Sequence, residues 1–326
     1  MNILYIAPDH MLQPYFDDFK EVAADEFDIS LFDSKRSIAS QFQGIDVVVE
    51  HGGAYSTPEM LDAGVKSGVK LWQVTATGLD HVNVESFLDR GIALSNMPGP
   101  VSTAIPMAEH ALFMMLALSK RLYASQHSFN EGILNLPMTS EIFGKTVGLI
   151  GLGASGKELA RRCGVLGMTV MAIDLVDVSK EILDELGIEF FGKTDDLDKV
   201  LRGSDYISLH IPLTTKTRQF IDRRSIGLMK KSACLINVSR GELLDEEALI
   251  EAIEQGHIAG AGLDALCDEP VEPTHPLLHY ENVIVTPHNG VVTRELSLRR
   301  AQVATDQVRR VVNGESPLYQ VRSLPQ

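Results

Sequence analysis

The chain of 326 residues contains only three cysteines, Cys163, Cys234 and Cys267, and no CxxC pair. This spacing argues against a disulfide framework or a zinc knuckle and favours a reducing compartment. We expect each cysteine to be a small buried apolar residue. The sequence also lacks an HExxH motif and a cluster of carboxylates, so it predicts no metal site.

Basic residues are scarce. The sequence has 29 lysines and arginines against 44 aspartates and glutamates, which gives a formal net charge of −15. A field of this sign repels the phosphate backbone of nucleic acids, so their binding would need a local basic patch. The nearest candidates are ARR at 160–162 and RR at 299–300, which we interpret as solvated helix faces. We therefore expect no nucleic-acid partner.

Long hydrophobic runs are also missing. The longest clean apolar run, ALFMMLAL at 111–118, is too short to cross a bilayer. The first residues, MNILYIAPDH, turn polar at once and show neither a basic n-region nor a cleavage-like site. These observations predict a cytoplasmic protein with no membrane partner.

Short apolar runs alternate with amphipathic segments along the whole chain, a pattern typical of βαβ units in a parallel sheet. In the first part, strands are predicted at 2–8, 27–33, 46–51, 70–78 and 92–97. The apolar segment at 102–122 predicts a long helix that connects two domains. Beyond it, six apolar runs from KTVGLIGLG to NVIVTP predict a six-stranded mononucleotide-binding sheet.

A glycine-rich segment follows the first of these runs. Gly151, Gly153 and Gly156 have GxGxxG spacing between a predicted strand and a predicted helix. They would permit a tight turn, the approach of a pyrophosphate, and close packing of helix on strand, while N–H groups at the helix start face the anion. Asp174, eighteen residues after Gly156, could accept hydrogen bonds from ribose hydroxyls. Since no arginine or lysine directly follows Asp174, the pattern favours NAD over NADP.

Titratable side chains follow three more predicted strands of the same half. Arg240 lies in CLINVSRGELLD, Asp264 and Glu269 lie in GAGLDALCDEP, and His288 lies in VIVTPHNG. Each alone has a simpler interpretation, such as a surface arginine, an exposed turn or a structural loop histidine. However, the carboxyl ends of parallel strands open on one edge of a sheet. We therefore expect these groups to converge beside a bound nicotinamide.

These segments, in this order, resemble the D-isomer-specific 2-hydroxyacid dehydrogenase family over essentially the whole chain. PMAEHALFMMLAL resembles the family's interdomain helix, and ATGLDHVNV resembles its substrate loop. The resemblance implies an α/β fold of two doubly wound parallel-sheet domains with a cleft between them. Residues 1–99 and 291–326 would form a discontinuous, flavodoxin-like substrate domain, with a C-terminal helix that crosses back and ends near Gly314. Residues 100–290 would form a Rossmann NAD-binding domain that includes the connecting helix.

The resemblance also implies an NAD-dependent enzyme, usually a homodimer, in which NADH gives a hydride to the carbonyl carbon of a small 2-oxo acid. His288 would donate the proton to the carbonyl oxygen, because its ordinary pKa of about 6.5 lies near working pH. Glu269 would hold the imidazole and favour its charged form. Arg240 would bind the substrate carboxylate with its planar guanidinium.

Further positions are assigned by the same resemblance. The backbone amides of Ala76, Thr77 and Gly78 would also bind the substrate carboxylate, and Asp264 would hold the nicotinamide carboxamide. Other residues at cofactor-contacting positions are Ala154, Ser155, Val238 and Ser239. His110 is expected to bond locally within its helix or an interface, and His210 could border the adenine.

The identity of the 2-oxo acid is less determined. The segments from Val47 to Tyr55 and from Leu71 to His81 contain no arginine or lysine, which disfavours a phosphorylated substrate unless another subunit supplies the cation. His51, Tyr55 and His81 favour a polar, uncharged substrate such as glyoxylate or hydroxypyruvate. The alternatives are 3-phosphoglycerate dehydrogenase activity and an NAD-sensing, corepressor-like interaction protein. Formate oxidation is disfavoured, because related enzymes of that type carry glutamine where Glu269 stands.

Overall fold

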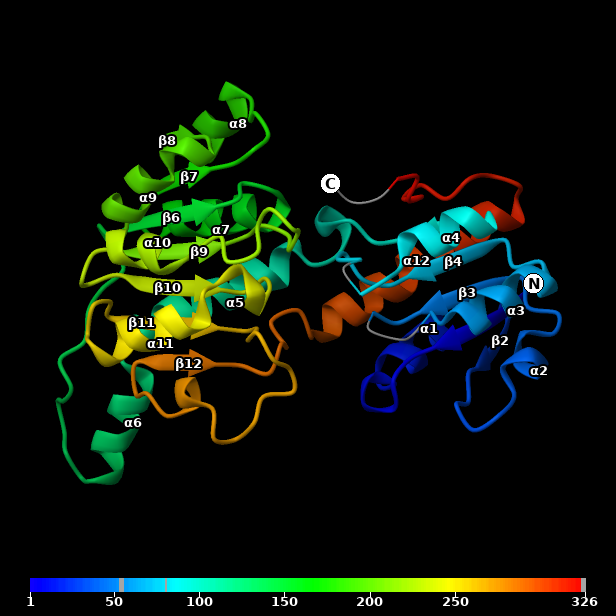
Figure 1. Cartoon of the computed structure of the whole chain (residues 1–326), viewed down its shortest axis with the longest axis horizontal. Coiled ribbons are helices and arrows are strands. Elements are labelled where there is room, and N and C mark those ends of the chain that lie inside the picture. The colour runs from blue at the N-terminus through cyan, green and yellow to red at the C-terminus, as the bar shows by residue number, and fades with distance from the viewer. Residues whose placement is uncertain (53–55, 80, 324–326) are drawn as a thin grey trace. The chain divides into compact units, whose positions relative to one another are not determined.

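The computed structural model describes residues 1–52, 56–79 and 81–323. The chain divides into two compact units. The first unit comprises Met1–Thr103 and Val292–Gln326, and the second comprises Ala104–Val291. Figure 1 shows that each unit is a sheet with helices on its faces. No helix among the described residues combines the length and apolarity needed to cross a membrane.

The first unit contains a five-stranded parallel sheet in the order β2-β1-β3-β4-β5, as in flavodoxin-like folds. The strands are β1 (Asn2–Ile6), β2 (Asp28–Leu31), β3 (Val47–Glu50), β4 (Leu71–Val74) and β5 (Leu94–Ser95). The order reverses between β1 and β3. All five predicted strands are present, and β3 and β4 are buried at every residue.

Helices α1 (Tyr15–Ala23), α2 (Ile38–Phe42), α3 (Pro58–Ser67) and α4 (Val84–Arg90) connect these strands, with short 3-10 turns at Asp9–Met11 and Gly99–Val101. Local sequence sets their ends. In α3, Thr57 accepts a hydrogen bond from the amide of Met60, Pro58 occupies the first turn, and Gly68 ends the helix in the left-handed conformation.

Helix α12 (Arg294–Val312) belongs to the first unit. It packs against α1, where Arg294 and Ser297 both bond to the buried carboxylate of Asp18. Gly314, with φ of +76°, follows the helix end as expected. One prediction for this helix was wrong. Arg300 does not lie on a solvated face but is 9% exposed, because this side of α12 covers the sheet.

The second unit contains a seven-stranded parallel sheet in the order β12-β11-β10-β9-β6-β7-β8, a Rossmann order with one additional strand. The strands are β6 (Thr146–Ile150), β7 (Thr169–Ile173), β8 (Ile188–Gly192), β9 (Tyr206–Leu209), β10 (Cys234–Asn237), β11 (Gly260–Leu263) and β12 (Val283–Val285). The predicted fold class of two doubly wound parallel sheets is confirmed. The predicted count of six strands was wrong, because β8 was missed. As an edge strand it is only partly buried and carries Glu189, so it lacks a continuous apolar run.

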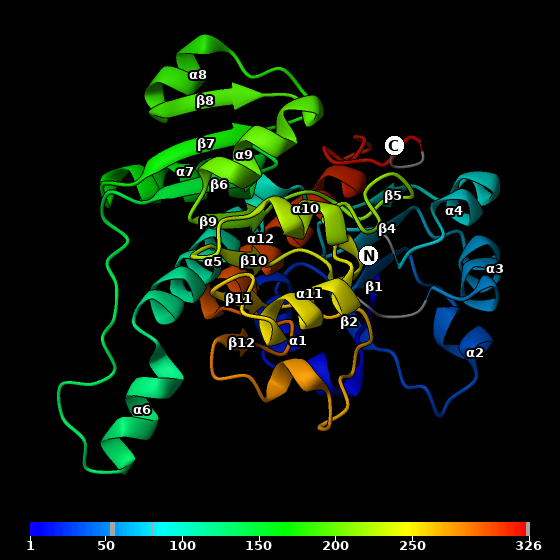
Figure 2. The ribbon, with the colours of Figure 1, turned by 60° about the vertical axis from the view of Figure 1, so that its left-hand side comes forward.

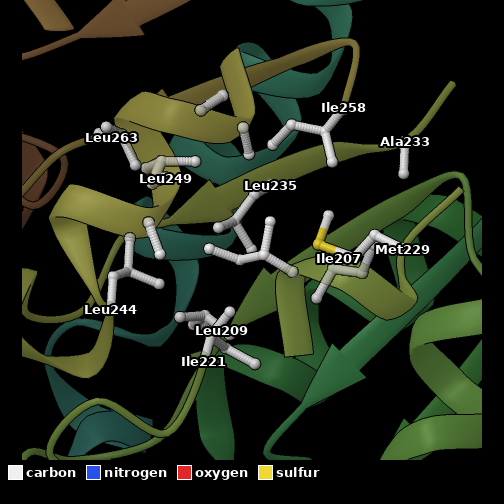
Figure 3. Packing of buried hydrophobic residues seen from close by; sticks show 14 of the residues in the cluster. Ile207, Leu209, Ile221, Met229, Ala233, Leu235, Leu244, Leu249, Ile258 and Leu263 are labelled. Carbon is white, nitrogen blue, oxygen red and sulfur yellow. The ribbon is translucent and has the colours of Figure 1, made fainter. Parts of the chain in front are cut away.

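Helices cover both faces of this sheet. They are α7 (Ala154–Val165), α8 (Lys180–Glu185), α9 (Leu197–Gly203), α10 (Arg223–Leu228) and α11 (Glu246–Glu254), with 3-10 turns at Thr194–Asp196, Gly241–Leu243 and Pro276–Leu278. Side chains of β9, β10 and α11 fill one face, as Figure 3 shows for Ile207, Leu235 and Leu249. The opposite face packs against α5 (Ala104–Ser119), where a Cβ on Gly262 would lie 2.8 Å from the Cβ of Met114.

The segment predicted as one helix at 102–122 is two helices, α5 (Ala104–Ser119) and α6 (Leu122–Asn130). Arg121 between them has a left-handed backbone with φ of 48°. After α6 the chain returns to the end of α5. There the amide of Ser140 donates a hydrogen bond of 2.9 Å to the carbonyl of Ser119, the last residue of α5. A residue distant in sequence therefore caps the last carbonyl of α5.

Candidate active site

The glycine-rich loop joins β6 to α7, and its three glycines differ in their surroundings. Gly151 has φ of +99°, and a Cβ there would lie 2.6 Å from the carbonyl oxygen of His210. A Cβ on Gly156 would lie 2.2 Å from the carbonyl oxygen of Gly151, whereas one on Gly153 would meet nothing within 4 Å. Gly151 and Gly156 thus permit the tight turn, and Gly153 leaves its outer side open to a pyrophosphate.

The first turn of α7 offers free hydrogen-bond donors. Among the described residues, none accepts a hydrogen bond from the backbone N–H of Ala154, Ser155 or Gly156. The Ser155 hydroxyl bonds at 3.0 Å to Nδ1 of His210, whose Nε2 bonds at 2.9 Å to Ser208. Burial lowers the pKa of His210 to about 4, so the ring is neutral at pH 7. This helix start can bind an anion without competition from an internal partner.

Asp174 directly follows β7, and its carboxylate bridges two backbone segments. It accepts hydrogen bonds from the amides of Leu152 at 2.6 Å and Val176 at 2.9 Å. Each carboxylate oxygen keeps a further lone pair that can accept a ribose hydroxyl. One nearby cation was missed by the sequence analysis. Lys193 lies 2.5 Å from Asp177, so its charge is already paired with a carboxylate.

Arg240 lies three residues beyond β10, in a turn held by a buried asparagine. The side chain of Asn237 donates to the carbonyl of Arg240 at 2.7 Å and accepts from the amide of Ser239 at 3.1 Å. The Ser239 hydroxyl donates to the carbonyl of Leu209 at 2.9 Å, and Val238 is buried. Asn237 was not predicted as a site residue, although a polar residue at the end of a buried strand is a usable signal.

The turn after Arg240 presses against a second turn of the site. A Cβ on Gly241 would lie 2.1 Å from the carbonyl carbon of Leu266, so only glycine fits there. The amide of Leu266 donates to the carboxylate of Glu269 at 3.2 Å. The positions of Arg240 and Glu269 are therefore linked through one backbone contact.

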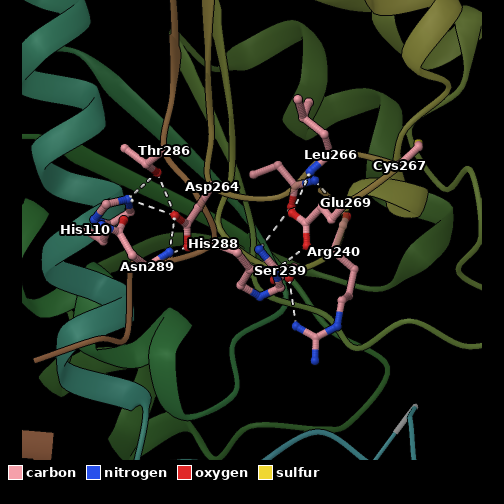
Figure 4. A network of polar contacts seen from close by, with 12 residues as sticks. His110, Ser239, Arg240, Asp264, Leu266, Cys267, Glu269, Thr286, His288 and Asn289 are labelled. Carbon is pink, nitrogen blue, oxygen red and sulfur yellow. Dashed lines mark hydrogen bonds and ion pairs between the residues drawn. The ribbon is translucent and has the colours of Figure 1, made fainter. Parts of the chain in front are cut away.

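His288 and Glu269 form a direct hydrogen bond of 2.8 Å between Nδ1 and a carboxylate oxygen. Both side chains are partly exposed, at 38% and 36%. The bond from Glu269 raises the pKa of His288, although burial and the charge of Arg240 oppose the change. Burial disfavours the Glu269 carboxylate, but the His288 contact outweighs it and lowers the Glu269 pKa. Figure 4 shows Arg240, Glu269 and His288 gathered at this edge of the sheet.

Asp264, the first residue after β11, holds the turn that carries His288. Its carboxylate accepts from the hydroxyl of Thr286 at 2.6 Å, the amide of Asn289 at 3.0 Å and the amide of Gly290 at 2.9 Å. Its carbonyl accepts from the amide of His288 at 2.9 Å, and His288 has a left-handed φ of 50°. Burial disfavours the charged carboxylate, but the hydrogen bonds from His110, Thr286 and Gly290 outweigh it and lower the Asp264 pKa. Such a backbone is unusual outside glycine and persists when its neighbours fix it.

His110 on α5 joins this network. Its Nε2 lies 2.9 Å from the hydroxyl of Thr286 and 3.4 Å from the carboxylate of Asp264 (Figure 4). The contact joins residues that are distant in sequence, so it does not stay within the helix. His110 therefore supports the turn of His288 through its contacts with Thr286 and Asp264.

The loop after β4 in the first unit exposes a row of backbone amides. The carbonyls of Ala76 and Thr77 accept hydrogen bonds from Met97 and Asn96, at 3.0 and 2.9 Å. Within the described part of the chain, no acceptor bonds to the amides of Ala76, Thr77 or Gly78. Successive free amides of this kind suit a carboxylate.

The other residues named for substrate choice differ in position. His51 is buried, and its Nδ1 bonds to the hydroxyl of Thr75 at 3.1 Å. Burial lowers the pKa of His51 to about 3. His81 is exposed, and Tyr55 lies outside the described residues.

No group of three or more potential metal ligands occurs among the residues that the structure describes. The segment HPLLH places two histidines four residues apart, but His275 bonds to Glu246 and His279 bonds to the carbonyl of Pro273. The three cysteines are free thiols. Cys163 and Cys234 are buried as expected, whereas Cys267 is only partly buried, because it lies in the turn before Glu269.

Comparison with known proteins decides the family. Residues 112–290 match the model of the D-isomer specific 2-hydroxyacid dehydrogenase NAD binding domain, more than half of the chain. The chain belongs to the D-isomer specific 2-hydroxyacid dehydrogenase family. The family model lies entirely within the second unit, which is therefore the NAD-binding domain of this family.

Several curated members of the family are similar to this chain. A glyoxylate reductase from Korarchaeum cryptofilum is 32% identical, over 87% of this chain and 85% of the relative. A hydroxypyruvate reductase from Thermotoga maritima is 36% identical, over 78% and 81%. A D-3-phosphoglycerate dehydrogenase from Methanocaldococcus jannaschii is 34% identical over 86% of this chain but only 52% of its own length. The chain thus spans about half the length of that relative.

Solved structures of family members share the fold. The NAD-complexed D-isomer specific 2-hydroxyacid dehydrogenase from Lactobacillus delbrueckii ssp. bulgaricus superimposes with a TM-score of 0.83 at 26% identity. The match covers 99% of this chain and all of that one.

Proposed function

We propose that this chain is an NAD-dependent D-2-hydroxyacid dehydrogenase that interconverts a small 2-oxo acid and its D-2-hydroxy acid. The observation that carries this function is the hydrogen bond of 2.8 Å between His288 and Glu269, at the same sheet edge as Arg240 and the glycine loop. Reduction of a 2-oxo acid requires three groups. They are an acid, here His288 with a raised pKa, a carboxylate that maintains the charge of this acid, and a guanidinium.

The residues present fit NAD. The open side of Gly153 and the free amides of Ala154, Ser155 and Gly156 would hold the pyrophosphate, and Asp174 would hold the adenosine ribose. Val238, Ser239 and Asp264 are proposed to line the nicotinamide end. When bound, the reduced cofactor supplies the hydride.

The side chains of this site divide the remaining chemistry. His288 donates a proton from its ring to the carbonyl oxygen as negative charge develops there, and in the reverse direction it accepts that proton. Glu269 keeps the ring oriented and favours its charged form. Arg240 binds the substrate carboxylate with two parallel N–H groups. The amides of Ala76, Thr77 and Gly78 are proposed as the carboxylate-binding donors of the first unit. The first unit would thus serve as the substrate domain.

Glyoxylate or hydroxypyruvate is the proposed substrate class. The similarity to a glyoxylate reductase and a hydroxypyruvate reductase over most of their lengths supports this choice. 3-Phosphohydroxypyruvate is the second candidate, supported by similarity to the D-3-phosphoglycerate dehydrogenase. A panel of 2-oxo acids, assayed by NADH oxidation, separates the two. Highest kcat/KM with 3-phosphohydroxypyruvate would favour the second candidate.

The catalytic assignment is tested by His288→Ala. Loss of the general acid should lower kcat by roughly 10²- to 10⁴-fold while NADH affinity changes little. His279→Ala is the matched control, because this exposed histidine of the same unit bonds only to a backbone carbonyl in the described structure. Arg240→Lys should damage both KM and kcat, because the planar fork is lost. Unchanged turnover in His288→Ala would remove the proton-donor role. No turnover of the native chain with any 2-oxo acid of the panel would favour an NAD-sensing interaction protein.

A homodimer in the cytoplasm is proposed as the working form. Helix α6 and the segment after it stand away from the sheet of their own unit (Figure 2) and expose Phe129, Leu134, Met138 and Phe143. Exposed apolar side chains gathered in one segment suit contact with a second copy. Three free thiols suit a reducing compartment. Sedimentation of the double variant Leu134→Asp, Met138→Asp should show a monomer where the native chain shows a dimer, and a native monomer would refute the dimer.

A further inference from the structure

A small cavity in the first unit lies at the carboxyl ends of its central strands. The cavity has a volume of about 10 Å³. Its walls include Tyr5 of β1, His51 after β3, Thr75 after β4, Tyr15 of α1, and Ser297 and Arg300 of α12. Strands β1 and β3 flank the point where the strand order reverses. In open α/β sheets this is the position at which ligands bind.

Arg300 brings a buried positive charge to this cavity without a counter-charge. Among the described residues, no carboxylate forms an ion pair with it and no acceptor bonds to it, and its Nε is buried without a partner. Its contact is with the ring of Tyr15, whose centroid lies 5.9 Å from the guanidinium carbon. Burial lowers the pKa of Arg300, but a guanidinium stays protonated in proteins. A buried charge left uncompensated is strongly unfavourable.

The other polar groups around the cavity are also donors in need of an acceptor. Nε2 of His51 is buried without a partner, and its Nδ1 already bonds to Thr75. When the Thr75 hydroxyl donates to Nδ1, the neutral ring carries its proton on Nε2. No hydrogen bond within the described structure engages the hydroxyl of Tyr5 or Tyr15. The closest carboxylate of α1, Asp18, is already bonded to Arg294 and Ser297.

We propose that this pocket binds one small monovalent anion of halide size. A volume of about 10 Å³ is at the lower limit for one water-sized particle, so the pocket takes a single spherical particle and not a carboxylate or phosphate group. A halide is slightly larger than water, so the pocket must widen a little to admit it. A water molecule fits but leaves the charge of Arg300 uncompensated, whereas a halide accepts hydrogen bonds and neutralises it. Through His51 and Thr75, the bound ion would also steady the start of the loop that carries Ala76, Thr77 and Gly78.

Thermal unfolding tests the pocket in solution. The full chain is melted in chloride, bromide and gluconate at equal ionic strength, with Trp72 fluorescence as the readout because this single tryptophan lies in the first unit. When the halide concentration is about ten times its Kd, chloride and bromide should raise the melting temperature by on the order of 3 °C over gluconate. Arg300→Met should lose this difference, and Arg299→Met, a partly exposed neighbour on the same helix, should keep it. Equal melting temperatures in all three salts would overturn the proposal.

Diffraction gives a second measurement that does not depend on any variant folding. Crystals grown in bromide should show an anomalous peak in the cavity, within hydrogen-bond distance of Arg300 and His51. A cavity that holds only water density under these conditions would overturn the proposal. Neither measurement requires turnover, so the pocket is tested independently of the proposed dehydrogenase function.

Discussion

Replacing Asp264 by asparagine would disturb the turn of His288 without changing the shape of the side chain. Asparagine offers one acceptor oxygen and one NH₂ group, but the amides of Asn289 and Gly290 donate to different oxygens of Asp264. At least one backbone N–H must then face a donor. An unsatisfied buried donor costs about 1–3 kcal/mol, and Asp264→Ala, which removes both acceptors, should cost about twice as much.

Hydrogen exchange of peptides covering 283–291 measures this loss directly. A cost of about 1–3 kcal/mol should speed exchange in this turn by roughly 5- to 150-fold in Asp264→Asn, with a parallel fall in kcat because His288 is less well placed. Asp268→Asn, on an exposed carboxylate nearby, is the control. Unchanged exchange in Asp264→Asn would refute the reasoning. Faster exchange throughout the second unit would show that the residue supports the whole unit and not this turn in particular.

Three further outcomes are expected. Glu269 raises the pKa of His288, so the protonated ring persists to higher pH. Glu269→Gln should therefore move the alkaline limb of the pH profile of kcat/KM for reduction to lower pH. A limb that does not move would contradict the pairing of His288 with Glu269. Burial raises the pKa of Glu50 to about 7, and its carboxylate accepts from the indole N–H of Trp72 at 2.6 Å. Trp72 fluorescence should therefore titrate near pH 7 in the native chain and stay flat in Glu50→Gln; a flat native curve would show that Glu50 does not titrate there. Asp174→Ala should raise the Kd for NAD and reduce the ratio of the Kd for NADP to the Kd for NAD. An unchanged ratio would remove Asp174 from the cofactor site.

The sequence predicted the strands that form continuous apolar runs. Strands such as β3 and β10 are buried along their whole length, so they read as continuous apolar runs. Strand β8 has one neighbour and a mixed sequence, so its pairing with β7 is visible only in three dimensions. The end of α5 at Ser119 escaped prediction for the same reason, because Ser140 is distant in sequence.

The candidate site shows the same division. Arg240 and His288 could be placed because parallel strands bring their carboxyl ends to one edge, a rule that needs no coordinates. The contact of His110 with Thr286 could not be placed, because it depends on how α5 packs across the sheet. The burial of Arg300 was likewise hidden, since a pair of arginines on a helix resembles a solvated face until the opposing surface is known.

The contact at Gly241 constrains how the two turns it joins can rearrange. Leu266 leaves no room there even for a methyl group, so neither turn can be displaced toward the other. A substrate that pushes on Arg240 therefore meets resistance from the backbone that positions Glu269. The Arg240 guanidinium and the Glu269 carboxylate are therefore expected to move together. An inhibitor that must displace one of them would also have to displace the other.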